Sequence, residues 1–258
     1  YNTMYFSYLL VDTGNNPDRL RPGRLWLRNR YHVHQRLCMA FPSVSRKEND
    51  PSFLKPFNPD EFGYGQVHVQ RDMNSGFLFQ IEPLPGSRVM IIVQSAIMPD
   101  WDYAFHNAKN LLAAPPMVKE FSPGFSVGER LRFRLIANPT RRLSKHSQDV
   151  KTGSIGKRVP VQPDKLIDWI ARHAKSSGFT IQPEDITIQL GYIYMNKDGK
   201  GQRLRSVLFE GLLRVSEPDV FRKTLVRGIG SGKAFGFGML RIISERDESS
   251  GSARSAQV

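Results

Sequence analysis

Two successive parts of this sequence show the same order of predicted elements, and this repetition limits the possible folds more than any single motif. The first part contains a strand-like run, an amphipathic stretch that ends at Pro42, two strands, a second helix and a closing strand: 5–11, 25–40, 77–82, 88–95, 101–113 and 117–121. Apolar residues at helical spacing mark the helices, and short apolar runs beside turn residues mark the strands. The resulting order, strand–helix–strand–strand–helix–strand, is typical of the ferredoxin-like fold.

The second part repeats this order. Its predicted elements are the strand 130–136, the helix 164–176, the strands 186–195 and 203–215, the helix 218–226 and the strand 237–243. We therefore predict an α+β protein with two tandem ferredoxin-like (RRM-like) domains, at 4–121 and 130–243, joined by a linker at 122–129. Residues 43–65 are predicted to be an irregular insertion, 139–158 a basic loop or hairpin, and 1–3 and 244–258 tails.

The charge balance indicates a polyanionic partner. Lysine and arginine number 37 against 24 acidic residues, which gives a formal net charge of +13 and favours nucleic acid over a membrane surface. Cys38 is the only cysteine, which excludes an intramolecular disulfide and a cysteine-rich zinc site. No run approaches the roughly 18 apolar residues of a membrane span, and no signal peptide is evident. We expect a soluble, cytoplasmic protein without a membrane partner.

A glycine-rich segment precedes the last predicted strand. Residues 228–238 contain five glycines and Lys233, and consecutive N–H groups in such a loop can form a concave nest for phosphate. Ala234 after Gly232-Lys233 excludes a P-loop, and Lys233 stands where a dinucleotide-binding motif needs its last glycine. The segment also departs from the RNA-recognition-motif consensus at Ala234 and Gly238. A tight turn with close packing remains the alternative to a phosphate site.

The spacing Gly-x-Gly, five residues, Gly-x-Gly is similar to the C-terminal loop of CRISPR repeat-processing endoribonucleases. Further segments occur in the same order as in one branch of that family: 4–7, 31–35, 77–82, 93–99, 133–139, 157–160, 209–211 and 228–238. The chain therefore resembles the CasE family, which processes repeat RNA and forms part of the type I-E Cascade complex. The insertion at 43–65 departs from shorter members of the family.

The resemblance implies cleavage of a CRISPR repeat hairpin without a metal or other cofactor. The 2′-OH of the RNA attacks the adjacent phosphorus and leaves a 2′,3′-cyclic phosphate and a 5′-OH. His34 matches the family's catalytic histidine, and Tyr31 lies three residues earlier, on the same helical face. We expect His34 to transfer protons and Tyr31 to position the phosphate or ribose. The alternatives are a packed, structural His34 and a competing role for His32; the remaining histidines, 68, 106, 146 and 173, show no partner pattern.

The resemblance also implies a basic hairpin that binds the RNA stem, and the expected partners are the repeat hairpin and the other Cascade subunits. Shape and phosphate contacts should dominate, because A-form RNA hides its base edges in a deep, narrow groove. The candidate RNA-binding residues are Lys157, Arg158, Arg141, Arg142, Lys151, Gly228, Gly230, Lys233, Gly236 and Gly238. The alternating Arg130, Arg132 and Arg134 could be a binding face or the wet side of a strand. A noncatalytic RNA-binding or scaffold subunit of the same fold remains the alternative function.

Overall fold

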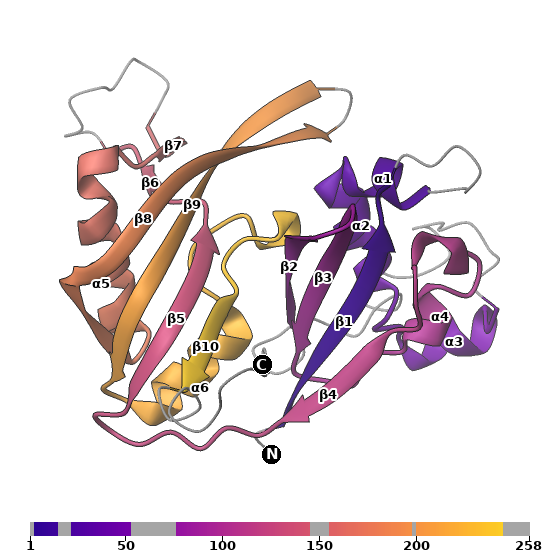
Figure 1. The fold of residues 1–258 in the computed structure, drawn as a ribbon, viewed down its shortest axis with the longest axis horizontal. Helices are drawn as coiled ribbons and strands as arrows, with labels where there is room; N and C mark the ends of the chain where they lie inside the picture. The colour runs from indigo at the N-terminus through magenta and orange to yellow at the C-terminus, as the bar shows by residue number, and fades with distance from the viewer. Residues whose placement is uncertain (1–2, 15–21, 53–75, 145–154, 198–199, 245–258) are drawn as a thin grey trace. The chain divides into compact units, whose positions relative to one another are not determined.

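The computed structural model describes residues 3–14, 22–52, 76–144, 155–197 and 200–244 (Figure 1). The chain forms two compact units. Unit 1 comprises Tyr1–Pro123, Met195–Gly201 and Ala234–Gly236, and unit 2 comprises Gly124–Tyr194, Gln202–Lys233 and Phe237–Val258.

Unit 1 contains a four-stranded sheet in the order β2-β3-β1-β4. The strands are β1 (Met4–Asp12), β2 (Phe77–Leu84), β3 (Arg88–Ser95) and β4 (Met117–Phe121). Both neighbours of β1 run antiparallel to it, with Leu9 opposite Ile91 and Ser7 opposite Val118. The central position of the first and third strands is that of a ferredoxin-like sheet.

The helices of unit 1 differ from the sequence prediction in two places. The stretch predicted as one helix up to Ala40 is divided into α1 (Pro22–Leu27) and α2 (Arg30–Cys38). Asn29 begins α2, because its side-chain oxygen accepts a hydrogen bond from the Tyr31 N–H at 3.1 Å. The helix predicted at 101–113 was also wrong, since α4 (Trp101–Ala104) is short and only a 3-10 turn, η1 (Lys109–Leu111), follows it.

The beginning of the predicted insertion is helical rather than irregular. Residues Val44–Asn49 form α3, whose N-cap Ser43 accepts a hydrogen bond from the Arg46 N–H at 3.0 Å. Arg46 is buried and forms an ion pair with Asp50 at 3.2 Å, and the Tyr103 hydroxyl donates to the Asp50 carbonyl at 2.9 Å. Residues 53–65 of the insertion lie outside the described residues.

The core of unit 1 lies between its sheet and α2. Val33 and Leu37 of α2 are fully buried against strand residues, among them Leu9, Phe79 and Ile91. Because Val33 and Leu37 are four residues apart, they form one apolar stripe along the helix. This packing fixes the rotation of α2 about its axis and so decides which side chains it presents elsewhere.

Unit 2 repeats the topology, and the predicted fold class of two tandem ferredoxin-like domains is confirmed. Its sheet has the order β10-β5-β9-β8, where β5 is Arg130–Ala137, β8 is Phe179–Lys197, β9 is Lys200–Val215 and β10 is Leu240–Ser244. The helices are α5 (Leu166–Ser176), preceded by η2 (Pro163–Lys165), and α6 (Pro218–Arg227). A separate two-stranded hairpin pairs β6 (Thr140–Arg142) with β7 (Arg158–Pro160).

The core of unit 2 is aromatic. Trp169 of α5 stacks on Phe209 of β9 with the ring centroids 5.7 Å apart, and Phe179 lies between Phe133 and Phe221 at 6.3 and 5.8 Å. The strand β5 shows the predicted alternation, since Leu131, Phe133 and Leu135 are buried whereas Arg130 and Arg132 are exposed. The hairpin strands β8 and β9 are longer than the predicted 186–195 and 203–215.

Candidate active site and RNA-binding surfaces

Tyr31 and His34 lie next to each other on α2. Their ring centroids are 6.3 Å apart, as their spacing of three residues requires. Both side chains are half-buried, whereas His32 is exposed and lines a separate pocket of about 240 Å³ with Trp26 and Met39. The structure therefore pairs Tyr31 with His34 and leaves His32 on another side of the helix.

The His34 ring lies against two phenylalanines of β2. Its centroid is 5.5 Å from that of Phe77 and 6.2 Å from that of Phe79, and both pairs are stacked. The Nε2 atom of His34 is 3.7 Å from the sulfur of Cys38, one turn further along α2. Sulfur is a weak hydrogen-bonding partner, so a ribose hydroxyl or a phosphate oxygen can replace this contact at little cost. The His34 ring is thus half-buried, with Nε2 beside the Cys38 sulfur.

Residues Phe235 and Gly236 lie against the face of α2 that carries Arg30 and Tyr31. Arg30 donates a hydrogen bond from Nη1 to the Phe235 carbonyl at 3.2 Å, and the Phe235 ring is 6.4 Å from that of Tyr31. Burial lowers the pKa of Arg30 to about 10, so the guanidinium stays protonated at neutral pH. Arg30 was not predicted as a site residue, although its position four residues before His34 places both on one helical face.

The glycines of 228–238 are required by the backbone. All five have positive φ angles, between 71° and 90°. A residue with a side chain would be strained at such angles. Several also pack too closely for a side chain: a Cβ on Gly238 would lie 2.6 Å from the Ile229 carbonyl oxygen, and one on Gly232 would lie 2.9 Å from Phe237. Close packing therefore explains much of the glycine content, as the alternative interpretation expected.

Part of the glycine segment uses its N–H groups inside unit 2. The Gly228 N–H donates to Thr224, the Ile229 N–H to Gly238, and the Gly238 N–H to Ile136, at 2.7 to 2.8 Å. These donors close the segment onto α6 and β5, so they are engaged before any RNA arrives. Gly236 and Gly238 are buried. The Lys233 residue is exposed overall, but its amine is partly desolvated, and this desolvation together with the charge of Arg227 lowers its pKa.

The basic hairpin carries four of the predicted RNA-binding residues. Arg142 pairs with Arg158 across β6 and β7, and the exposed Lys157 precedes β7. Arg158 donates to the Thr140 hydroxyl at 3.2 Å, whereas Arg141 is half-buried and lines a pocket of about 220 Å³ with Arg205. The hairpin thus gathers Arg141, Arg142, Lys157 and Arg158. Lys151 lies outside the described residues.

The arginines of β5 share a groove with acidic residues. Arg132, Arg134 and Arg241 line a groove of about 550 Å³ together with Asp185 and Glu210. Arg134 forms an ion pair with Glu210 at 3.4 Å across the β5–β9 register. Since the positive charge there is partly balanced, this face is a weaker candidate for phosphate binding than the hairpin.

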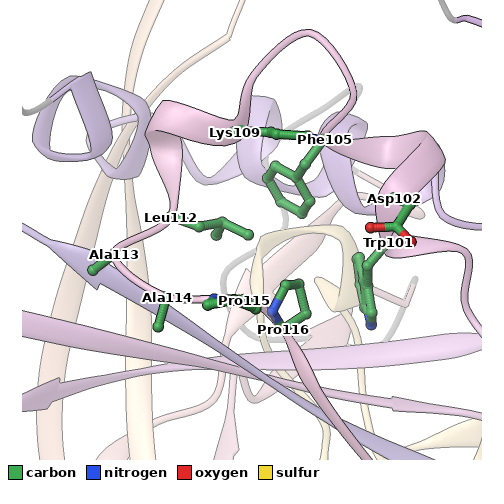
Figure 2. Close-up of a pocket in the computed structure, with 9 residues that line it drawn as sticks. All are labelled: Trp101, Asp102, Phe105, Lys109, Leu112, Ala113, Ala114, Pro115 and Pro116. Carbon is green, nitrogen blue, oxygen red and sulfur yellow. The ribbon is translucent and has the colours of Figure 1, made fainter.

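A further pocket of about 380 Å³ lies in unit 1 (Figure 2). Trp101, Phe105, Leu112 and Pro116 form its apolar lining, and Asp102 and Lys109 supply its charges. None of the candidate catalytic residues lines it. Within the part of the chain that the structure describes, no three His, Cys, Asp or Glu residues gather in a way that could hold a metal ion. Of the helices described, none is both long and apolar enough to cross a membrane.

Known proteins resemble this chain over two thirds of its length or more. A family model described as CRISPR associated protein matches residues 4–243. The CRISPR-associated endoribonuclease Cse3 of Thermus thermophilus is 32% identical over 190 residues, which cover 67% of this chain and 84% of that protein. The Cascade subunit CasE of Escherichia coli is 27% identical over 221 residues, which cover 85% of this chain and 94% of that protein.

The solved structures agree with this relationship. The structure of Thermus thermophilus Cse3 bound to an RNA representing a pre-cleavage complex has a TM-score of 0.66 and 29% identity, and the match covers 93% of this chain and 99% of that one. The chain therefore belongs to the family of CRISPR-associated proteins. Within this family it is similar to the CasE and Cse3 type.

Proposed function

We propose that this protein is an endoribonuclease that cleaves CRISPR precursor RNA at the repeat hairpin and yields mature guide RNA. The observation that carries the proposal is the Tyr31–His34 pair on α2, found in a chain whose relatives are named endoribonucleases. The RNA bound to Thermus thermophilus Cse3 in a pre-cleavage complex supports an RNA substrate. A role in this process also places the protein in the cytoplasm.

The proposed reaction is attack by the RNA's own 2′-OH, without a metal ion. The 2′-oxygen forms a bond to the adjacent phosphorus while the bond from phosphorus to the 5′-oxygen breaks. The 2′-OH loses a proton and the leaving 5′-oxygen gains one, so the products are a 2′,3′-cyclic phosphate and a 5′-OH. A histidine can perform either proton transfer near neutral pH, and we assign this role to His34.

Tyr31 is proposed to position the scissile phosphate or the ribose. Its ring lies between those of His34 and Phe235, which fixes its direction on the helix face. A phenolic hydroxyl can donate a hydrogen bond to a phosphate oxygen without changing its charge at neutral pH. Such a donor gains strength as the phosphorane oxygens become more negative in the transition state.

RNA binding is assigned to the basic residues of unit 2. Lys157 and Arg158 on the hairpin, with Arg141, Arg142 and Lys233, offer positive charge suited to a phosphate backbone. Gly228, Gly230, Gly236 and Gly238 would contribute through the shape of the loop, since their backbone angles are available only to glycine at little cost. We also propose that the protein remains bound to its product as a Cascade subunit, as the name of the CasE relative suggests.

Mapping the product ends of the protein's own repeat RNA in EDTA tests this proposal. We expect a single cut, a 2′,3′-cyclic phosphate on the upstream fragment and a 5′-OH on the downstream one. A matched RNA with 2′-deoxyribose at the nucleotide before the cut should bind and remain intact. Strict magnesium dependence, or normal cleavage of the deoxy substrate, would contradict the mechanism. Tight binding without any cleavage would instead support a noncatalytic scaffold subunit.

A further inference from the structure

Arg30 occupies an unusual position for an arginine. Its side chain is half-buried beside the aromatic residues of the site, and its guanidinium donates to a backbone carbonyl, that of Phe235. A long, strongly solvated side chain loses hydration and rotamer freedom in such a place. A carbonyl acceptor compensates for only part of this loss, so the geometry calls for an explanation beyond stability.

The contacts around Arg30 form a closed ring of residues that includes His34. Arg30 holds Phe235, Phe235 lies against Tyr31, and Tyr31 lies against His34. His34 in turn stacks on Phe79. Phe79 also borders Gly236, since a Cβ on Gly236 would lie 3.2 Å from the Phe79 ring and 3.0 Å from Arg30 Nη1.

The closure depends on two residues that are adjacent in sequence. Phe235 contacts the tyrosine side of the ring, and Gly236 contacts the Phe79 side. Gly236 has a φ angle of 83° and is buried, so the turn that presents both contacts accepts no side chain there. In the contacts described, Arg30 provides the direct hydrogen bond from α2 to this pair.

We propose that Arg30 is a positioning residue that clamps Phe235–Gly236 against α2 and thereby sets the placement of Tyr31 and His34 for RNA cleavage. The effect on cleavage rests on the proposed function, whereas the clamp itself does not. A positioning role predicts a slower chemical step at nearly unchanged RNA affinity, because misplacement of reacting groups by about 1 Å can cost up to about 100-fold in rate.

Hydrogen exchange of the protein without RNA tests the clamp. The backbone amides around Phe235 should exchange faster in Arg30→Met, which keeps much of the side-chain volume and loses every donor. Arg30→Lys keeps one charged donor and should restore much of the protection. Unchanged exchange in Arg30→Met would overturn the clamp, whatever the enzyme does with RNA.

Single-turnover cleavage of the repeat RNA at saturating enzyme tests the link to chemistry. We expect Arg30→Met to lower the rate by about 10- to 100-fold, with the dissociation constant changed by less than about threefold, and Arg30→Lys to recover part of the rate. Gly236→Ala should lower the rate through the same contact, so the double variant should be no slower than the slower single one. Gly128→Ala, at a similar φ of 83° with nothing within 4 Å of its Cβ, is the matched control.

The outcomes separate the two proposals. The positioning role would be overturned if Arg30→Met and Gly236→Ala lowered the cleavage rate independently, so that their factors multiply in the double variant. A rate loss matched by an equal loss of RNA affinity would also overturn it. Failure of the wild-type protein to cleave would overturn the proposed function and with it the effect on cleavage, while hydrogen exchange still decides the clamp. A normal rate in Arg30→Met, with the fold intact by circular dichroism, would also overturn the positioning role.

Discussion

The helices α2 and α5 hold equivalent places in the two units, and each carries a histidine close to an aromatic residue. On α2, His34 lies beside Tyr31, with a weak contact from Nε2 to the Cys38 sulfur. On α5, the His173 ring lies only 4.3 Å from that of Trp169, which itself stacks on Phe209 in the core. Desolvation, with a smaller contribution from Arg172, lowers the pKa of His173.

The two histidines differ in the side chains around them, and this difference separates the roles that we propose for them. The half-buried His173 ring packs on Trp169, which is itself buried in the core of unit 2. Tyr31 adds a hydroxyl beside His34, and Arg30 brings a positive charge to the same helical face. We therefore expect the proposed proton transfer from His34 and a packing role for His173.

Exchanging each histidine for alanine gives the largest expected contrast. His34→Ala should reduce single-turnover cleavage of the repeat RNA by at least about 100-fold, because it removes the proposed proton-transfer group, with hairpin affinity largely intact. His173→Ala should cleave at nearly the wild-type rate and lose about 1 kcal/mol of stability. The comparison fails if His34→Ala cleaves normally or if His173→Ala loses activity without unfolding.

A smaller contrast comes from the aromatic partners. Tyr31→Phe removes one hydroxyl and keeps the ring packing, so cleavage should slow by about 10- to 100-fold at unchanged melting temperature. Trp169→Phe should instead lower the melting temperature and leave the rate at saturating RNA unchanged, since it reduces burial in the core of unit 2. Equal cleavage rates for Tyr31→Phe and wild type would show that the Tyr31 hydroxyl has no part in cleavage and that the ring only packs.

The topology of both units could be predicted from local patterns. Alternating basic and apolar residues identified β5, and the repeated order of elements identified the fold class. The errors arose where a side chain ends or begins a helix. Asn29 caps α2 and separates it from α1, and α4 ends at its C-cap residue Phe105, where the backbone leaves the helical angles (φ −109°, ψ 13°).

The candidate site could be predicted only in part. Tyr31 and His34 are three residues apart, so helical spacing is enough to place them together. The contact between Arg30 and Phe235 joins residues separated by 205 positions, and no local pattern reports on such a pair. The stacking of His34 on Phe77 and Phe79 likewise depends on how α2 packs against β2.

Removing charge from the basic hairpin should weaken RNA binding and leave the cleavage step proposed for α2 unchanged. A Lys157→Gln, Arg158→Gln double variant should bind the repeat hairpin about tenfold more weakly and reduce the salt dependence of binding, with an unchanged cleavage rate at saturation. Lys175→Gln, which removes an exposed charge near the end of α5, is the control. Unchanged affinity and salt dependence in the double variant would remove the hairpin from the proposed RNA-binding surface.

The smallest expected effect concerns the contribution of His173 to the pH dependence of stability. Its pKa is lowered in the folded protein from the ordinary value of 6.5, so the unfolded chain binds the proton more readily. Stability from this group is therefore complete above pH 6.5 and is lost as the pH falls through the window below it. In urea titrations between pH 7.5 and about 5, His173→Gln should show a shallower loss of unfolding free energy than the wild type. An identical pH slope in the two proteins would mean that the packing of His173 on Trp169 leaves its protonation unaffected.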